Sequence, residues 1–198
     1  MSKPGDVVAV VLAAGLSRRY GNGDKLLHPL GGRPLCLHIA ATLRRLPFSR
    51  RVAVCSNPAV AQLFEAEGFA VVRNADPQIG LGSSLRIAVQ AAGNASPILV
   101  CLADMPFVTP THLLALAHAF QAGSADPVAS AGPDFIGPPA IFSAGLLEHL
   151  PANGEGGARA LLRGATTMEA APRELADFDT RAALEAASAG DLDPSLQP

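Results

Sequence analysis

The chain has 198 residues, of which 49% are hydrophobic and 16% are charged, and its formal net charge is −2. This length suits one domain with a substantial core, expected over residues 1–189 with a frayed tail at 190–198. The small net charge excludes a general attraction to nucleic acid or to an anionic membrane, so neither is an expected partner. Three widely spaced cysteines argue against a disulfide framework or a zinc knuckle and favour the cytoplasm.

Apolar runs alternate with helical patterns along most of the chain. The runs predict strands at residues 7–12, 51–55, 69–72, 97–102, 126–131 and 139–142. The helical patterns lie at residues 34–46, 58–67, 83–92, 110–121, 144–150, 157–163 and 181–187. Prolines 34, 58 and 110 are expected in first helical turns and Ser83 at an N-cap. The alternation is typical of an α/β fold with a mostly parallel sheet wrapped by helices.

Two loops of this fold are expected to face each other. Ligands of doubly wound sheets bind at the carboxyl ends of the strands, where the strand order reverses. If the first and fourth strands are neighbours there, the loops at 13–25 and 103–110 flank one crevice. We therefore expect the functional site in that crevice.

The first of these loops, LAAGLSRRYGNGDK over residues 12–25, combines small residues with three cations. Its backbone N–H groups can form a nest for phosphate oxygens, and Arg18, Arg19 and Lys25 can supply positive charge for a triphosphate. The run is neither a P-loop nor a GxGxxG fingerprint, because the required spacing is absent from it. A solvated surface turn is the alternative interpretation of this loop by itself.

The second loop follows a buried strand and contains Asp104, within LVCLADMPFVTP. A carboxylate at this position is well placed for Mg²⁺, which prefers hard oxygen ligands. The alternative is that Asp104 only shapes the turn before Pro106.

Residues 12–35, LAAGLSRRYGNGDK followed by LLHPLGGRPL, resemble the signature of the MobA-like nucleotidyltransferases. The closest likeness is to the molybdenum cofactor cytidylyltransferase branch. The resemblance implies a three-layer α/β/α Rossmann-like nucleotidyltransferase fold. It also implies that a nucleotide is bound by Leu12, Ala13, Ala14, Gly15, Leu16, Ser17, Arg19, Lys25 and Asn74. Tyr20 stands where the family usually has Met, and position 18 varies in the family.

The same resemblance extends to the carboxylates. The Asp-Met-Pro motif is matched at Asp104, which implies a catalytic role for Lys25, Arg19 and Asp104. The segment ADFDTRAALEAA resembles the family's Asp-Ile-Asp-Thr-Pro-x-Asp-Leu and suggests Asp179 as a second metal ligand, although positions 181 and 183 depart from the pattern. Alternatively, Asp179 or Thr180 caps the helix that follows.

The acceptor side rests on a GLGSSL run that is similar to the family's GLxSSL. This resemblance makes Gly82, Ser83 and Ser84 candidates for the acceptor phosphate, with an ordinary helix start as the alternative. Further on, Pro138 replaces the family's His or Asn, and Glu155 replaces its Asp.

The implied function is transfer of CMP from CTP to the terminal phosphate of a molybdopterin-type cofactor, with release of pyrophosphate. Mg²⁺ is the expected metal, with Mn²⁺ as an alternative, and a molybdenum hydroxylase is the client that the resemblance suggests. The Ala13–Ala14 pair points to CTP, since family members with Ala-Gly tend to use GTP. Two alternatives stay open: transfer to another phosphorylated small molecule, such as a sugar or polyol phosphate, and a maturation protein that binds nucleotide or cofactor without turnover.

Overall fold

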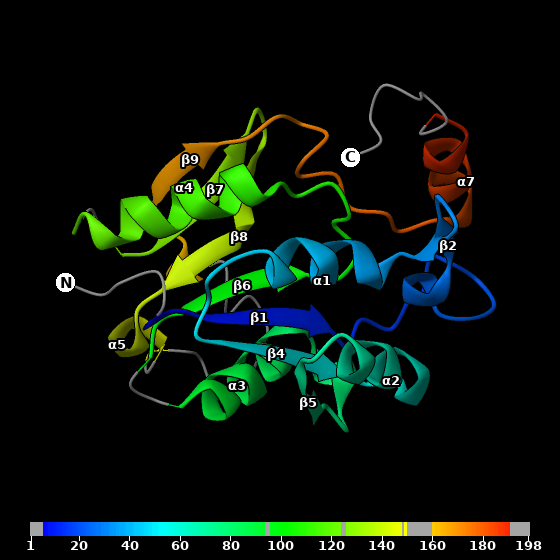
Figure 1. The fold of residues 1–198 in the computed structure, drawn as a ribbon, viewed down its shortest axis with the longest axis horizontal. Helices are drawn as coiled ribbons and strands as arrows, with labels where there is room; N and C mark the ends of the chain where they lie inside the picture. The colour runs from blue at the N-terminus through cyan, green and yellow to red at the C-terminus, as the bar shows by residue number, and fades with distance from the viewer. Residues whose placement is uncertain (1–5, 94–95, 124–125, 148, 150–159, 191–198) are drawn as a thin grey trace.

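The computed structural model describes residues 6–93, 96–123, 126–147, 149 and 160–190. Within them, seven strands form one sheet in the order β5-β4-β1-β6-β8-β7-β9 (Figure 1). The strands are β1 (Val8–Ala13), β4 (Arg50–Cys55), β5 (Ala70–Arg73), β6 (Ile98–Leu102), β7 (Val128–Gly132), β8 (Phe135–Phe142) and β9 (Thr166–Glu169). Only β8 runs antiparallel to its neighbours β6 and β7. The predicted α/β class with a mostly parallel sheet is therefore confirmed.

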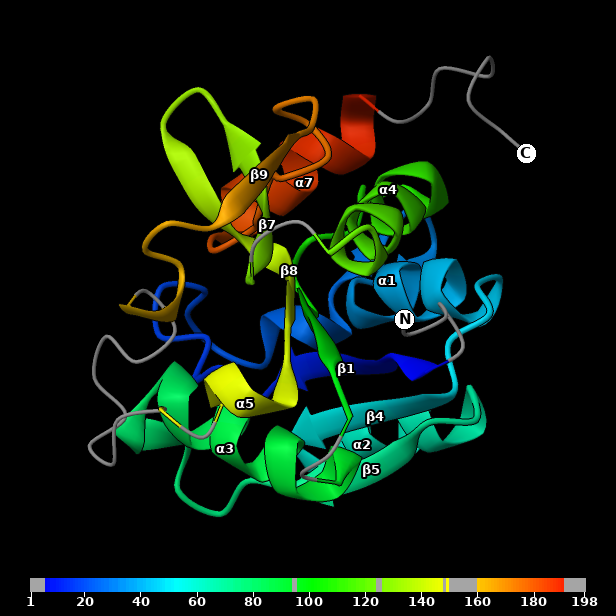
Figure 2. The same cartoon turned by 90° about the vertical axis from the view of Figure 1, so that its left-hand side faces the viewer.

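Helices cover both faces of the sheet, as Figure 2 shows. They are α1 (Cys36–Arg44), α2 (Pro58–Ala66), α3 (Leu81–Ala92), α4 (Pro110–Gln121), α5 (Ala144–Leu147) and α7 (Arg181–Gly190). Strand β1 is buried along its whole length, and its side chains alternate between two apolar clusters. Ala9 and Val11 pack into the cluster of α1, α2 and α4, whereas Val10 and Leu12 pack into the cluster of α3 and α5. Burial on both faces explains the continuous apolar run.

The helix starts differ in part from the sequence-based expectation. Pro58 and Pro110 do begin α2 and α4, because an N1 proline lacks only an N–H that the helix does not use. Pro34 instead lies in a short hairpin of β2 (Pro29–Leu30) and β3 (Arg33–Pro34), and α1 begins after it. Ser83 is not an N-cap: α3 begins two residues earlier, and its N-cap is Gly80 with φ 107°, a conformation that favours glycine.

Other boundaries and one strand were not anticipated. Strand β9, an edge strand with a half-exposed pattern, follows a chain segment that showed only helical character in sequence. The predicted helix at 157–163 lies mostly outside the described residues, as does Glu155. Helix α7 continues to Gly190, so residue 190, which was expected in the tail, is helical. Residues 191–198 are not described.

The arrangement of β1 and β6 places the site. From β1 the chain winds outward to β4 and β5, then crosses back to β6 on the other side of β1. β1 and β6 pair in parallel, and the Ala103 N–H donates to the Leu12 carbonyl where the two strands end. The expected neighbour relation is thus confirmed, and the two loops start side by side. Over the residues that the structure describes, no helix has the length and apolar character needed to cross a membrane.

Candidate active site

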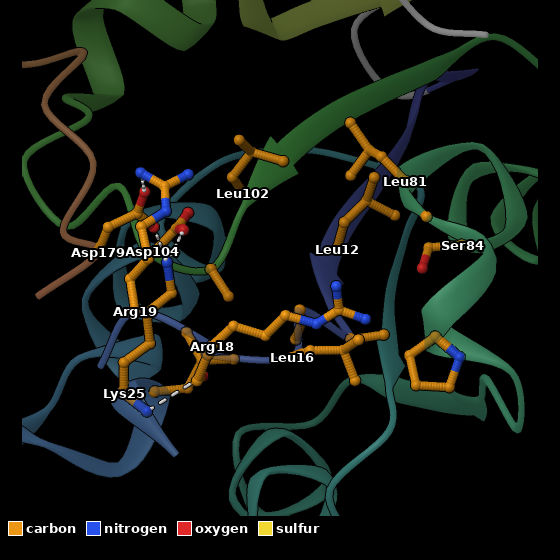
Figure 3. A pocket seen from close by; sticks show the side chains of 18 of the residues that line it. Leu12, Leu16, Arg18, Arg19, Lys25, Leu81, Ser84, Leu102, Asp104 and Asp179 are labelled. Carbon is orange, nitrogen blue, oxygen red and sulfur yellow. Dashed lines mark hydrogen bonds and ion pairs between the residues drawn. The ribbon is translucent and has the colours of Figure 1, made fainter. Parts of the chain in front are cut away.

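A cavity of about 420 Å³ opens at the carboxyl ends of β1 and β6 (Figure 3). This volume is in the range of small-molecule sites. Its lining comes from the first loop, the end of β6, the start of α3 and the C-terminal segment. The lining residues are Leu12, Ala13, Ala14, Gly15, Leu16, Ser17, Arg18, Arg19, Lys25, Leu26, Pro77, Gln78, Gly80, Leu81, Ser84, Leu102, Ala103, Asp104 and Asp179.

The first loop is held in shape by Asp24, a residue for which the sequence suggested no role. The Asp24 carboxylate accepts hydrogen bonds from the Leu26 N–H at 3.0 Å, from Asn57 Nδ2 at 2.9 Å and from Ser17 Oγ at 3.2 Å. Ser17 has a φ of 47°, which is uncommon for a residue with a side chain. Its Oγ also accepts the Lys25 N–H at 3.3 Å. These bonds tie both ends of the loop together and set the direction of Lys25.

Lys25 lies between two carboxylates of the cavity lining. Its Nζ donates to Asp104 Oδ2 and to Asp179 Oδ1, both at 2.6 Å, and the residue is only 6% exposed. Burial acts to lower the pKa of Lys25, but the two carboxylates outweigh it and the pKa is raised. The hydrogen bond from Lys25 lowers the pKa of Asp179 against the effect of its burial. The amine is therefore held as a cation at neutral pH.

The two candidate metal ligands come from distant segments of the chain, Asp104 after β6 and Asp179 before α7. The Phe178 N–H donates to the Asp104 carbonyl at 3.3 Å, which joins the two segments next to their carboxylates. Asp179 Oδ2 pairs with Arg19 Nη1 at 2.8 Å, and the Arg19 side chain is 78% exposed. The capping role belongs to Thr180, whose Oγ1 accepts the Ala183 N–H at 3.2 Å. Asp179 is thus directed into the cavity, away from the helix it precedes.

The residues present fit a divalent cation of the Mg²⁺ type. Two carboxylates converge on one cationic atom, so a hard oxygen pair faces a single point. Among the described residues there is no group of three or more His, Cys, Asp or Glu side chains that could enclose a metal by themselves. Two carboxylates agree with the habit of Mg²⁺ of keeping waters and substrate phosphates as its other ligands.

Tyr20 and Arg181 both differ from the residues that are usual in the family, and their side chains contact each other. The guanidinium of Arg181 lies 5.0 Å from the centre of the Tyr20 ring, a cation–π contact. The Tyr20 hydroxyl also shares a hydrogen bond of 2.6 Å with His28 Nδ1. Together these contacts join the start of α7 to the first loop.

Not all of the expected site residues reach the cavity. The whole expected run from Leu12 to Ser17, with Arg19 and Lys25, does so, and Arg18 lines it as well. Asn74 does not: it is 2% exposed, and its amide donates to the hydroxyls of Ser83 and Ser84 in α3. Of the expected acceptor residues, Ser84 lines the cavity whereas Gly82 and Ser83 do not, because the helix begins earlier and turns them away.

Several lining residues were missed in the sequence. Pro77, Gln78, Gly80 and Leu81 belong to the short η3 helix (Pro77–Ile79) and the start of α3, which line the cavity together with the first loop. Leu81 is 45% exposed and is the first residue of α3. The position of Leu81 between Gly80 and Gly82 was the available signal in the sequence, and it did not distinguish a cavity lining from an ordinary loop.

Known proteins with related sequences and folds support one assignment. The α/β fold matches that of the homolog of Mycobacterium tuberculosis Rv0371c from Mycobacterium sp. strain JC1, with a TM-score of 0.76 and 27% identity over 95% of this chain and 98% of that one. A nucleotidyl transferase from Methanothermobacter thermautotroptrophicus has the same fold, with a TM-score of 0.75 and 24% identity over 93% of this chain and 96% of that one. The model of the MobA-like NTP transferase domain matches residues 9–172. This chain belongs to the MobA-like NTP transferase family.

Two further relatives show the spread of that similarity. Molybdopterin-guanine dinucleotide biosynthesis protein A from Archaeoglobus fulgidus has the same fold, with a TM-score of 0.67 and 17% identity over 93% of this chain and 98% of that one. The bifunctional protein GlmU of Sphingopyxis alaskensis is 32% identical over 124 residues, which are 62% of this chain and 28% of that protein. The matched part is thus about a quarter of the length of that curated relative.

Proposed function

We propose that this chain is a nucleotidyltransferase that transfers CMP from CTP to the terminal phosphate of a molybdopterin-type cofactor, with release of pyrophosphate. The observation that carries the proposal is the convergence of Lys25, Asp104 and Asp179 at the end of the first loop. Membership of the MobA-like family supports nucleotide transfer as the chemistry. The Ala13–Ala14 pair supports CTP as the donor, and the resemblance to the cytidylyltransferase branch supports the acceptor.

The reaction asks the protein mainly for position and charge. An acceptor phosphate oxygen attacks the α-phosphorus of CTP in line, the bond from that phosphorus to the bridging oxygen breaks, and pyrophosphate leaves with the electron pair. The attacking oxygen is already ionised near neutral pH, so no general base is required. Lys25 and Arg19, with the loop N–H groups, would bind and stabilise the charge that develops on the phosphates.

A magnesium ion is part of the proposal. Asp104 and Asp179 would hold it, and when bound it would neutralise phosphate charge and orient the triphosphate. Lys25 would then be freed from the carboxylates to donate to phosphate oxygens. Mn²⁺ offers the same coordination chemistry and is expected to substitute.

One assay tests the proposal. Purified protein is incubated with Mg²⁺, each of the four nucleoside triphosphates and molybdopterin cofactor, and pyrophosphate is measured; parallel reactions contain a sugar phosphate or no acceptor. We expect release with CTP and cofactor only. Faster release with GTP would contradict the choice of base, and release with the sugar phosphate alone would contradict the acceptor. Nucleotide binding without pyrophosphate from any combination would indicate a binding protein.

A further inference from the structure

The cavity has two chemically different ends, which Figure 3 shows on opposite sides. Lys25, Asp104, Asp179 and Arg19 gather at one end. At the other end Ser84 lies beside Leu12 and Leu81, and the Arg18 side chain extends from the first loop toward these mostly apolar walls. If the proposed triphosphate occupies the charged end, the rest of the nucleotide extends toward the apolar end. The flat base is the part of a nucleotide that packs best against apolar side chains.

At the apolar end, the hydroxyl of Ser84 is oriented by Asn74. The side-chain oxygen of Asn74 accepts the Asp76 N–H at 2.9 Å, which fixes the orientation of the amide. Its Nδ2 is therefore turned toward α3, where it donates to Ser83 Oγ at 3.0 Å and to Ser84 Oγ at 2.9 Å. Both hydroxyl oxygens are thus acceptors, and each serine must send its own proton elsewhere.

The two serines then differ in what they can do with that proton. Ser83 donates to the Gly80 carbonyl at 2.9 Å, so its hydroxyl is fully used. Ser84 is 4% exposed and lines the cavity, and none of the described residues accepts its proton. A buried hydroxyl with an unused proton favours a ligand atom that can accept it.

We propose that Ser84 donates a hydrogen bond to an acceptor atom of the nucleobase, O2 or N3 in the case of cytosine, and that Asn74 acts as a positioning residue that holds the Ser84 hydroxyl in its donor orientation. This inference rests on the proposed function, because it assumes a nucleoside triphosphate in the cavity. It moves Ser84 from the acceptor phosphate, where the family resemblance placed it, to the base of the donor nucleotide. It also gives Asn74 a role behind the cavity wall.

The test compares a ligand with a base and one without. Calorimetry measures the affinities of CTP and of inorganic tripolyphosphate, each with Mg²⁺, for wild-type protein and for Ser84→Ala. We expect Ser84→Ala to weaken CTP binding about tenfold and to leave tripolyphosphate binding unchanged, since one hydrogen bond to the base is lost. Ser83→Ala is the matched control, because Ser83 shares the Asn74 amide but does not line the cavity; both affinities should stay within about twofold.

The positioning role of Asn74 needs a second variant. Asn74→Leu is similar in size but cannot orient the hydroxyl, so CTP binding should weaken with tripolyphosphate binding unaffected. In the Ser84→Ala background the same change should cause no further loss of CTP affinity, because the group that Asn74 orients is already gone. Thermal unfolding shows whether each variant is folded, and Ser84→Ala alone still tests the base contact if Asn74→Leu is not.

The outcomes separate this inference from the proposed function. A loss of CTP affinity in Ser84→Ala supports the base contact even if no acceptor yields pyrophosphate. Unchanged CTP affinity overturns it, and a raised KM for the phosphorylated acceptor in that variant would return Ser84 to the acceptor side. If wild-type protein prefers another of the four nucleoside triphosphates, the comparison is made with that one. Failure to bind any of the four overturns the inference.

Discussion

Lys25 lies where its positive charge stabilises two neighbouring carboxylates, those of Asp104 and Asp179. Its side chain is 8% exposed, against 19% for Asp104 and 34% for Asp179, so the ion pairs are only partly screened by water. Without an occupant at this point the two carboxylates would repel each other. The lysine therefore has a structural role in holding the two carboxylates together, besides the role proposed for it with phosphate.

Replacing Lys25 by Ala is expected to lower the free energy of unfolding by about 2 kcal/mol, less than for a fully buried pair because Asp179 is a third exposed. Urea unfolding with and without Mg²⁺ measures the effect. Mg²⁺ should raise the stability of the variant more than that of the wild type, because the metal can take the vacant position between the carboxylates. An equal response of both proteins would show that the carboxylates do not form the metal site.

Asp104→Asn tests the metal ligand directly. The amide keeps the shape of the side chain but loses the charge that binds Mg²⁺. We expect magnesium-dependent pyrophosphate release to disappear, with circular dichroism and thermal unfolding close to wild type. Asp177→Asn, two residues before Asp179 and exposed, is the control and should retain activity. Near-normal turnover in Asp104→Asn would remove this residue from the metal site.

At the scale of elements, helix α4 carries the second site loop on its N-terminal side. Thr109 caps the helix by accepting the His112 N–H at 3.2 Å, and its hydroxyl also donates to Glu174. One residue thus joins the helix start to the segment that leads to Asp179. Thr111 lies exposed in the first turn of the same helix and provides a matched control.

Thr109→Ala is expected to destabilise the protein by about 1 kcal/mol, since the cap hydrogen bond is lost. Thr111→Ala should be neutral or slightly stabilising, because alanine has the higher helix propensity. Urea denaturation of the two variants and the wild type provides the comparison. Equal midpoints for both variants would mean that the Thr109 hydroxyl contributes nothing to stability.

At the scale of the whole molecule, stability should depend on pH through His112. This residue is 6% exposed and shares a 2.7 Å hydrogen bond with Ser130 Oγ, which donates its own proton to the Pro139 carbonyl at 2.6 Å. His112 Nε2 must therefore be the donor toward Ser130. Burial lowers the pKa of His112, with Glu174 opposing the shift. The imidazole is thus favoured in its neutral form in the folded protein.

The sign of the effect follows from proton counting. Between the ordinary histidine pKa of about 6.5 and the lower value in the fold, the unfolded chain binds more protons than the native one. The stability that neutral His112 provides is complete above about pH 6.5 and is lost as the pH falls toward the folded value. His112→Gln can donate to Ser130 without titrating, so it should lose less stability than the wild type between about pH 8 and about pH 5 in urea unfolding. An equal loss would contradict the assignment.

Much of the fold could be predicted because its signals are local. The β-branched run at β1, the prolines at the starts of α2 and α4, and the alternation of apolar and helical segments each reflect the environment of a single element. The boundaries that failed have a local cause too. At the start of α3, the left-handed conformation of Gly80 allowed an earlier helix start than the serine pattern suggested. Strand β9 is a half-exposed edge strand and lacks a strong pattern.

The sequence by itself determined the composition of the first loop, the buried strands on either side of the site and the family resemblance, because each depends on residues that are adjacent in the chain. Only the tertiary structure decided which distant groups meet. It brought Asp179 to Lys25 and Asp104, gave the helix cap to Thr180, placed Arg181 on Tyr20 and put Asn74 behind Ser84. Such pairings depend on how loops from different strands converge at one edge of the sheet; the alternation of strands and helices predicted that the first two loops face each other, but not which side chains meet.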